Sequence, residues 1–220
     1  MHTDIRNFTL VTAAYWGFTL TDGALRMLVL LHFYSLGYSP FEIALLFLFY
    51  EFFGIVTNLV GGWIGARMGL KVTLFAGLAL QIIALSILAL FDPTWGVWQG
   101  VAYVMGAQAL SGIAKDLTKM SSKSAVKVLV PEGEHGQLFK WVAVLTGSKN
   151  ALKGLGFFLG GLLLAGLGFS VALFAMAMGL ALVLLASVVS LPGELGQAKS
   201  KVKFSAIFSK SRNINYLSAA

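Results

Sequence analysis

The sequence predicts an all-α integral membrane protein with six transmembrane helices. Of the 220 residues, 58% are hydrophobic and only 11% are charged, and the mean hydropathy is +0.83. Soluble domains carry about 25% charged residues, so this composition favours a membrane protein. The apolar residues gather in six stretches, each long enough to cross a bilayer as a helix of about 20 residues.

Short turns separate the six stretches. Pro40 ends the first turn, Asp92 and Pro93 end the third span, and Pro131 breaks the chain before the fifth. A basic amphipathic segment continues the fourth span to Val130. The spans are expected at about residues 8–34, 41–64, 72–91, 95–119 and 138–164, followed by a sixth that ends at Leu191.

Loop charge predicts the orientation of the spans. Lysine and arginine are absent from the turns after spans one, three and five, and they occur in the turns after spans two and four and in the tail. Cytoplasmic loops carry this excess of positive charge, so we expect a multi-pass protein of the bacterial inner membrane with a cytoplasmic N-terminus. Residues 1–193 form the predicted transmembrane unit. Residues 194–220 form a predicted cytoplasmic linker that leads to a truncated seventh span.

Charged side chains occur in four of the six spans. Spans three and six contain none, so those two can face lipid while the others face protein or water. This pattern repeats every three spans, which predicts two inverted three-helix repeats, a common architecture of secondary transporters. The residues singled out within the four spans are Asp22 and Arg26, Glu51 and Asn58, Lys115, Asp116 and Lys119, and Lys149 and Lys153.

The basic residues predict a binding site for an anion. A charge at the bilayer centre costs roughly 2.5–3.5 kcal/mol on insertion scales, so buried lysines indicate a function. Arginine offers oxyanions a bidentate fork, and lysine offers a point charge. The candidate substrate-binding residues are Arg26, Lys149, Lys153, Lys115, Lys119 and Asn58.

Each of these assignments has a structural alternative. Arg26 can simply pair with Asp22 one helical turn away, and the deep lysines can pair with Glu51 or extend toward the membrane surface. Asp22 and Glu51 are candidates for a proton-coupling or switch role. Glu51 is the stronger of the two, because Asp22 has Arg26 available as a partner.

One loop resembles a signature of the major facilitator superfamily. Gly62, Arg67, Gly69 and Lys71 match the family's pattern between spans two and three, while Ala66 replaces its usual aspartate. Residues 156–161 are similar to the family's antiporter signature, with phenylalanine in place of proline. The resemblance implies that this loop has a gating role and that the six spans form the N-terminal half of a twelve-span fold.

Longer strings resemble one subfamily, the ArsJ-type organoarsenical efflux permeases. The similar strings cover residues 14–44, 50–81, 111–127 and 139–161. The resemblance implies proton-coupled export of the arsenate ester of 3-phosphoglycerate and hence arsenate resistance. It also implies a glyceraldehyde-phosphate dehydrogenase as functional partner, and either a missing C-terminal half or a second copy of the chain.

Several functions are excluded or disfavoured. With no cysteine, thiolate metal sites are impossible and a carrier of free arsenite is disfavoured. His32 and His135 are isolated, so no metal or other cofactor is expected, nor is a nucleic-acid partner. No motif of an enzyme occurs. The alternatives are a facilitator for phosphorylated metabolites or other organic anions, a membrane enzyme, and an inactive half-transporter or scaffold.

Overall fold

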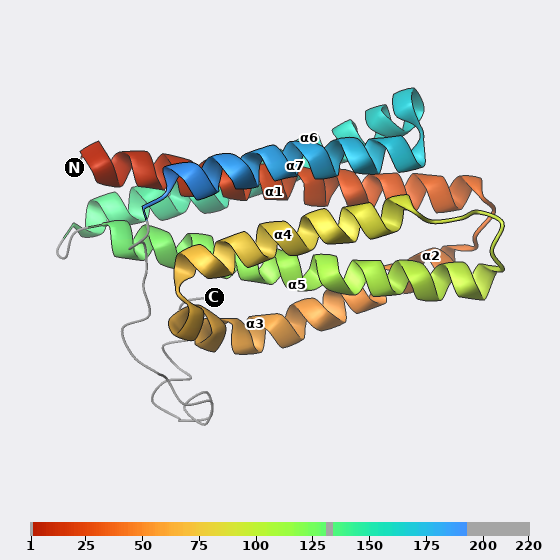
Figure 1. Cartoon of the computed structure of the whole chain (residues 1–220), viewed down its shortest axis with the longest axis horizontal. Helices are drawn as coiled ribbons and strands as arrows, with labels where there is room; N and C mark the ends of the chain where they lie inside the picture. The colour runs from red at the N-terminus through yellow and green to blue at the C-terminus, as the bar shows by residue number, and fades with distance from the viewer. Residues whose placement is uncertain (1, 131–133, 193–220) are drawn as a thin grey trace.

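The chain folds into a bundle of long α-helices that lie roughly side by side (Figure 1). The structure is a computed structural model that describes residues 2–130 and 134–192. The predicted linker and seventh span at 194–220 lie outside the described residues. The predicted all-α fold with six helical passages is confirmed. The helices are α1 (His2–Ser35), α2 (Pro40–Leu46), α3 (Leu48–Met68), α4 (Leu70–Ala89), α5 (Val97–Leu129), α6 (His135–Leu167) and α7 (Phe169–Ser190).

The second passage consists of α2 and α3, which are separated only by Phe47. Ser39 caps α2: its hydroxyl accepts a hydrogen bond from the backbone N–H of Glu42, and the Glu42 carboxylate accepts one from the backbone N–H of Ser39. Pro40 occupies the first helical position, where a missing N–H is tolerated. At Phe47 the backbone N–H donates to the carbonyl of Ala44, and this tighter turn interrupts the helix.

The fourth passage and the basic amphipathic segment that continues it form one helix, which ends at Leu129. No glycine or proline occurs between Gly112 and Val130, so nothing in the local sequence interrupts the backbone hydrogen bonds. The loop before α5 is held by Asp92, whose side chain accepts hydrogen bonds from the backbone N–H and the hydroxyl of Thr94. Both bonds lower the pKa of Asp92.

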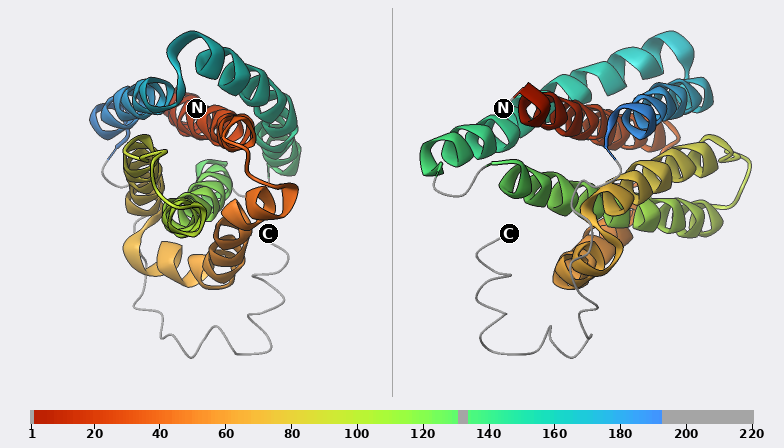
Figure 2. Two further views of the ribbon diagram at one scale, coloured as in Figure 1. Left: turned by 90° about the vertical axis from the view of Figure 1, so that its right-hand side faces the viewer. Right: turned by 60° about the vertical axis from the view of Figure 1, so that its left-hand side comes forward.

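The helices form two three-helix units of opposite direction, as predicted from the charge pattern. Figure 1 shows α1 and α5, the first helices of the two units, running in opposite directions. The second helix of each unit packs against the first helix of the other, α3 against α5 and α6 against α1. The third helices, α4 and α7, pack against each other. Figure 2 (left) shows this arrangement along the axis of the bundle.

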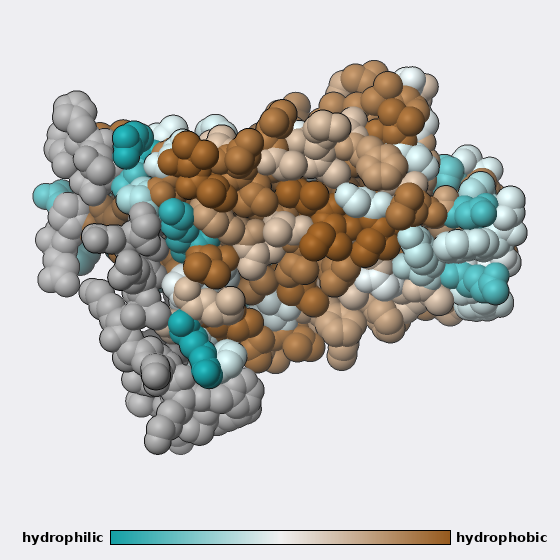
Figure 3. All heavy atoms as spheres, in the orientation of Figure 1, coloured by the Kyte–Doolittle hydropathy of each residue, from teal (hydrophilic) through white to brown (hydrophobic). Residues whose placement is uncertain are grey.

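Four passages are long and apolar enough to cross a membrane by length and composition, namely Pro40–Met68, Leu70–Ala89, His135–Leu167 and Phe169–Ser190. The other two, α1 and α5, have 34 and 33 residues but include more polar sequence. Both lie among several other helices, so their polar residues meet protein rather than lipid. The visible face carries a brown apolar belt across the middle of the bundle, with teal polar residues toward both ends (Figure 3).

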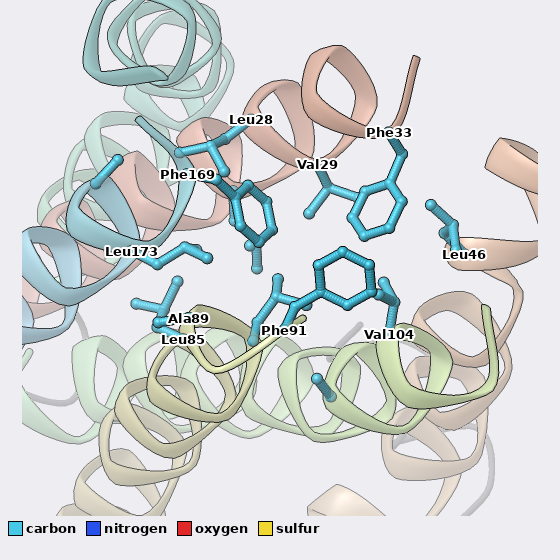
Figure 4. Packing of buried hydrophobic residues seen from close by; sticks show 14 of the residues in the cluster. Leu28, Val29, Phe33, Leu46, Leu85, Ala89, Phe91, Val104, Phe169 and Leu173 are labelled. Atoms are coloured by element: carbon cyan, nitrogen blue, oxygen red, sulfur yellow. The ribbon is translucent and has the colours of Figure 1, made fainter. Parts of the chain in front are cut away.

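A hydrophobic cluster fills the bundle near the end where α1 meets the turn to α2. Its aromatic centre is Phe33 of α1, Phe91 after α4 and Phe169 of α7; the Phe33 and Phe91 ring centroids are 4.8 Å apart (Figure 4). Leu85 and Val104 pack around them. The cluster closes this end of the bundle, so the polar residues of the four charged passages lie farther from the turn.

Candidate functional site: a basic cavity between four helices

A cavity of about 230 Å³ lies between α1, α3, α5 and α6. These helices belong to the passages that carry charge in the sequence, and α4 and α7 contribute no lining residue, as the charge pattern predicted. The lining residues are Tyr15, Phe18, Thr19, Asp22, Arg26, Glu51, Lys115, Asp116, Lys119, Lys149 and Lys153.

Glycines at two helix crossings set the width of the cavity. A Cβ atom at Gly23 of α1 would lie 2.7 Å from the carbonyl oxygen of Lys153 in α6, so only glycine allows this approach. A Cβ atom at Gly112 of α5 would overlap the carbonyl oxygen of Tyr50 in α3. The first crossing brings Lys153 beside Asp22 and Arg26. The second brings Glu51 beside Lys115.

Glu51 of α3 forms ion pairs with one cation of α1 and one of α5. Its carboxylate lies 2.7 Å from Nη2 of Arg26 and 3.3 Å from Nζ of Lys115. The predicted alternative, in which Arg26 pairs with Asp22, is therefore replaced by a pair with Glu51. The carboxylate of Asp22 instead accepts a hydrogen bond of 2.5 Å from the hydroxyl of Tyr50. Of these two carboxylates, Glu51 is the one with cationic partners within 4.0 Å in the described part of the chain, and the coupling role of either residue stays a prediction.

Asp116, which follows Lys115 on α5, forms a second cluster of charges. The residue is 4% exposed, and its carboxylate oxygens lie 3.8 Å from Nζ of Lys115 and 3.7 Å from Nζ of Lys119. A buried carboxylate needs such partners, since an isolated buried charge is strongly disfavoured. The charge of Lys119 is therefore partly offset by Asp116 of the same helix.

Lys149 and Lys153 of α6 face the cavity without a carboxylate partner. Among residues 2–130 and 134–192, neither ammonium group lies within 4.0 Å of an acidic oxygen. The Lys153 ammonium lies 5.9 Å from the ring centroid of Phe157, a weak cation–π contact. Beside Lys149, the indole N–H of Trp16 donates to the hydroxyl of Ser148 at 2.8 Å and so holds this part of α6 against α1.

The cavity has an excess of positive charge. Five basic side chains line it, against three carboxylates, and the three carboxylates already contact Arg26, Lys115, Lys119 or Tyr50. The excess therefore resides on Lys149 and Lys153. An anion that enters the cavity would find two ammonium groups with no carboxylate partner among the described residues.

The structure brings together seven of the predicted site residues and leaves others apart. Asn58 is half-buried on α3, and its Oδ1 atom has no hydrogen-bond partner within residues 2–130 and 134–192, but it does not line the cavity. The residues that line it as expected are Asp22, Arg26, Glu51, Lys115, Lys119, Lys149 and Lys153. Their roles in binding and coupling stay predictions.

The predicted gating loop lies at the junction of α3 and α4, outside the cavity lining. Gly69 has a φ of 87°, which explains the glycine at this turn. The guanidinium of Arg67 lies 5.2 Å from the ring centroid of Trp63. Nζ of Lys71 donates to the carbonyl oxygen of Leu191 at 2.7 Å, so it connects the start of α4 to the end of α7. Gly62 lies in the last two turns of α3.

Sequence reasoning missed four polar residues around the cavity. Tyr15 and Thr19 precede Asp22 and Arg26 at intervals of four, three and four residues, a spacing that places all four on one helical face and could have revealed them. Asp116 was noted as charged but was not assigned to the site. No sequence pattern marks Tyr50, which is fully buried behind the lining.

No group of three histidine, cysteine or acidic residues within the described ranges is placed to hold a metal ion. The carboxylates of the cavity are instead close to lysine and arginine.

The inverted helix units and the polar cavity within an apolar bundle define the chain as a membrane transport protein in its architecture. A family model described as Major Facilitator Superfamily matches residues 8–218. The chain belongs to the major facilitator superfamily. A comparison with curated proteins gives no match.

Solved structures of similar fold include transporters of the POT family. A transporter of the POT family in complex with a thioalcohol-conjugated peptide is 19% identical, with a TM-score of 0.66; the match covers 96% of this chain and 44% of that one. A bacterial homologue of the human drug peptide transporters is 13% identical, with a TM-score of 0.62, and covers 98% and 49%. The chain thus spans less than half the length of these transporters, and the likeness concerns the fold.

Proposed function

We propose that this chain forms half of the pathway of a membrane transporter that carries a multiply charged organic anion. The observation that carries the proposal is the pair of lysines, Lys149 and Lys153, that face the cavity without a carboxylate partner in the described part of the chain. Placing two ammonium groups between apolar helices is costly unless an anion binds there. Arg26 and Lys115 would complete the site once Glu51 releases them.

The substrate that we propose is the arsenate ester of 3-phosphoglycerate, exported from the cell. The support is the subfamily resemblance of residues 14–44 and 139–161, which include Arg26, Lys149 and Lys153. The ester carries phosphate, carboxylate and arsenate groups, which suit a cavity with an excess of cations. Proton coupling through Asp22 or Glu51 belongs to the same proposal, as does a cytoplasmic N-terminus.

A second candidate is a facilitator for phosphorylated metabolites or other organic anions, because the same lysines would serve those substrates. Competition between substrates separates the two. An enzyme is not supported, because the chain's family and similar structures are those of transporters.

The test measures arsenic accumulation in arsenic-sensitive cells that co-express the dehydrogenase. The cells carry the 220-residue chain, either alone or joined to the six further spans of an ArsJ-type permease. We expect lower accumulation with the joined form, and we expect Lys149→Gln combined with Lys153→Gln to abolish the effect.

Lys140→Gln is the matched control, because Lys140 is an exposed lysine of the same helix that does not line the cavity. Unchanged efflux in the double variant would refute the lysine site. If neither form lowers arsenic accumulation but phosphorylated metabolites are transported, the second candidate replaces the first.

A further inference from the structure

Tyr50 of α3 contacts three charged residues of the cavity at once, although it is itself fully buried. Its hydroxyl donates to Oδ1 of Asp22 at 2.5 Å. The guanidinium carbon of Arg26 lies 4.2 Å from the centroid of its ring, and Nζ of Lys115 lies 4.3 Å from the same centroid. One neutral side chain of α3 therefore touches a carboxylate and a cation of α1 and a cation of α5.

We propose that Tyr50 is a positioning residue that keeps the cavity basic. Its hydroxyl donates a hydrogen bond to Asp22, so that this carboxylate does not neutralise a neighbouring cation. Its ring holds Arg26 and Lys115 at the edge of the anion site. The inference rests on the proposed function, since it concerns how the same cavity keeps its affinity for an anion.

The sequence places Asp22 where it could form an ion pair with Arg26. Asp22 and Arg26 are four residues apart on α1, the spacing at which opposite charges on a helix pair. In the structure Arg26 instead reaches Glu51 at 2.7 Å, while Asp22 bonds Tyr50. Asp22 is only 5% exposed, so a carboxylate without a hydrogen-bond donor at this position would be costly. If the hydroxyl were removed, Asp22 would turn to Arg26 or to Lys153, which lines the same cavity.

The ring explains how two cations remain close together. Arg26 and Lys115 repel each other, and Glu51 alone offsets only part of their charge. A tyrosine face attracts cations through its quadrupole, and the attraction grows when the contact is shielded from water. Because Tyr50 is locked at the α3–α5 crossing, where Gly112 meets its backbone, both cations are held in place before an anion arrives.

A double-mutant cycle tests the proposal. The probe is 3-phosphoglycerate, and its equilibrium binding is measured on the whole chain in lipid nanodiscs. Tyr50→Phe keeps the ring and removes the hydroxyl; we expect the Kd to rise about tenfold, the usual effect of losing one charge-assisted interaction. Adding Asp22→Asn to Tyr50→Phe should restore binding, because no carboxylate then competes with the anion.

Asp22→Asn should lower the Kd clearly more in the Tyr50→Phe background than in the unaltered chain. This comparison separates the effect of losing the hydrogen bond between Tyr50 and Asp22 from the general repulsion between Asp22 and anions. Tyr50→Leu also removes the ring, so its binding should be weaker still and Asp22→Asn should restore it only in part. Tyr103→Phe is the control: it removes a hydroxyl that donates to the carbonyl of Ile87, outside the cavity. Thermal unfolding of each variant verifies folding.

The outcomes distinguish this inference from the proposed function. If the unaltered chain binds no 3-phosphoglycerate, the inference is overturned, and the efflux test of the joined form decides the proposed function separately. If it binds and Tyr50→Phe binds equally well, only the positioning role is overturned. An equal gain from Asp22→Asn in both backgrounds also overturns the role, because Asp22 would then oppose the anion whether or not the hydroxyl holds it.

Discussion

At the scale of single residues, the carboxylates of the cavity differ in how much they depend on their partners. Asp22 and Asp116 are 5% and 4% exposed, so each needs the hydrogen bond or the lysines that surround it. The Glu51 side chain is 54% exposed. Its ion pairs with Arg26 and Lys115 are therefore partly screened and contribute little to stability. We infer that Glu51 regulates the charge of the cavity rather than supporting the fold.

Glu51→Gln should strengthen anion binding without unfolding the protein. The substitution removes the counter-charge of Arg26 and Lys115, so the Kd for 3-phosphoglycerate should fall by a factor of about three to five, the range expected for a partly exposed ion pair. The free energy of unfolding should change by less than about 1 kcal/mol for the same reason. Equilibrium binding and chemical unfolding check both values. Weaker binding would mean that Glu51 holds the two cations in place for the anion.

At the scale of helices, the cavity depends on close crossings at glycine. Gly23 allows α6 to approach α1, and Gly112 allows α3 to approach α5. These crossings are equivalent in the two inverted units, because each joins the first helix of one unit to the second helix of the other. A wider crossing of α3 and α5 would separate Glu51 from Lys115, and a wider crossing of α1 and α6 would separate Lys153 from Asp22. The charged groups of the cavity would then lie farther apart.

Gly112→Ala should destabilise the protein by about 1–3 kcal/mol, because the added methyl group would overlap the Tyr50 carbonyl oxygen and push α3 from α5. Anion binding should weaken in parallel. Gly106→Ala on the same helix is the matched control: its methyl group would meet no atom within 4 Å, and alanine favours a helix by roughly 0.5–1 kcal/mol. Denaturation in detergent micelles measures both. Equal stability of the two variants would contradict the tight crossing.

The positions of most helices follow from apolar length and turn residues, which are local signals. Ser39, Pro40 and Glu42 start α2 as a capping box, and Gly69 turns the chain between α3 and α4. The extent of α5 was harder to predict because its apolar stretch ends near Lys119 while the helix continues to Leu129. Polar helix formers continue a helix as well as apolar residues do, so hydropathy alone does not show where such a helix ends.

At the scale of the whole molecule, the apolar belt and the distribution of charge together describe how the bundle sits in a bilayer (Figure 3). The exposed side chains of α7 include Val171, Met178, Leu182 and Val189, which suit contact with lipid tails. The two ends of the bundle differ in charge, because the basic turns all lie at the end of the N-terminus. The positive-inside rule therefore predicts that the end with the N-terminus faces the cytoplasm.

The orientation can be measured because the chain contains no cysteine. Gly136→Cys and Gly166→Cys place single thiols near the two ends of α6; both positions are exposed, and a Cβ atom at either would meet no other atom within 4 Å. A membrane-impermeant maleimide should label Gly166→Cys in intact cells and Gly136→Cys only after the membrane is opened. Labelling in the reverse order would place the N-terminus outside.

The sequence by itself determined the membrane class, the number of passages, the inverted repeat and the four passages that bear charge. These properties follow from composition and spacing along the chain. Only the tertiary structure decided the partners within the cavity: Arg26 pairs with Glu51 across two helices, Asp22 bonds Tyr50, and Lys149 and Lys153 face the cavity from α6. The physical reason is that an ion pair depends on distances between helices. Those distances are set at crossings such as Gly23 and Gly112, which no local pattern in the chain specifies.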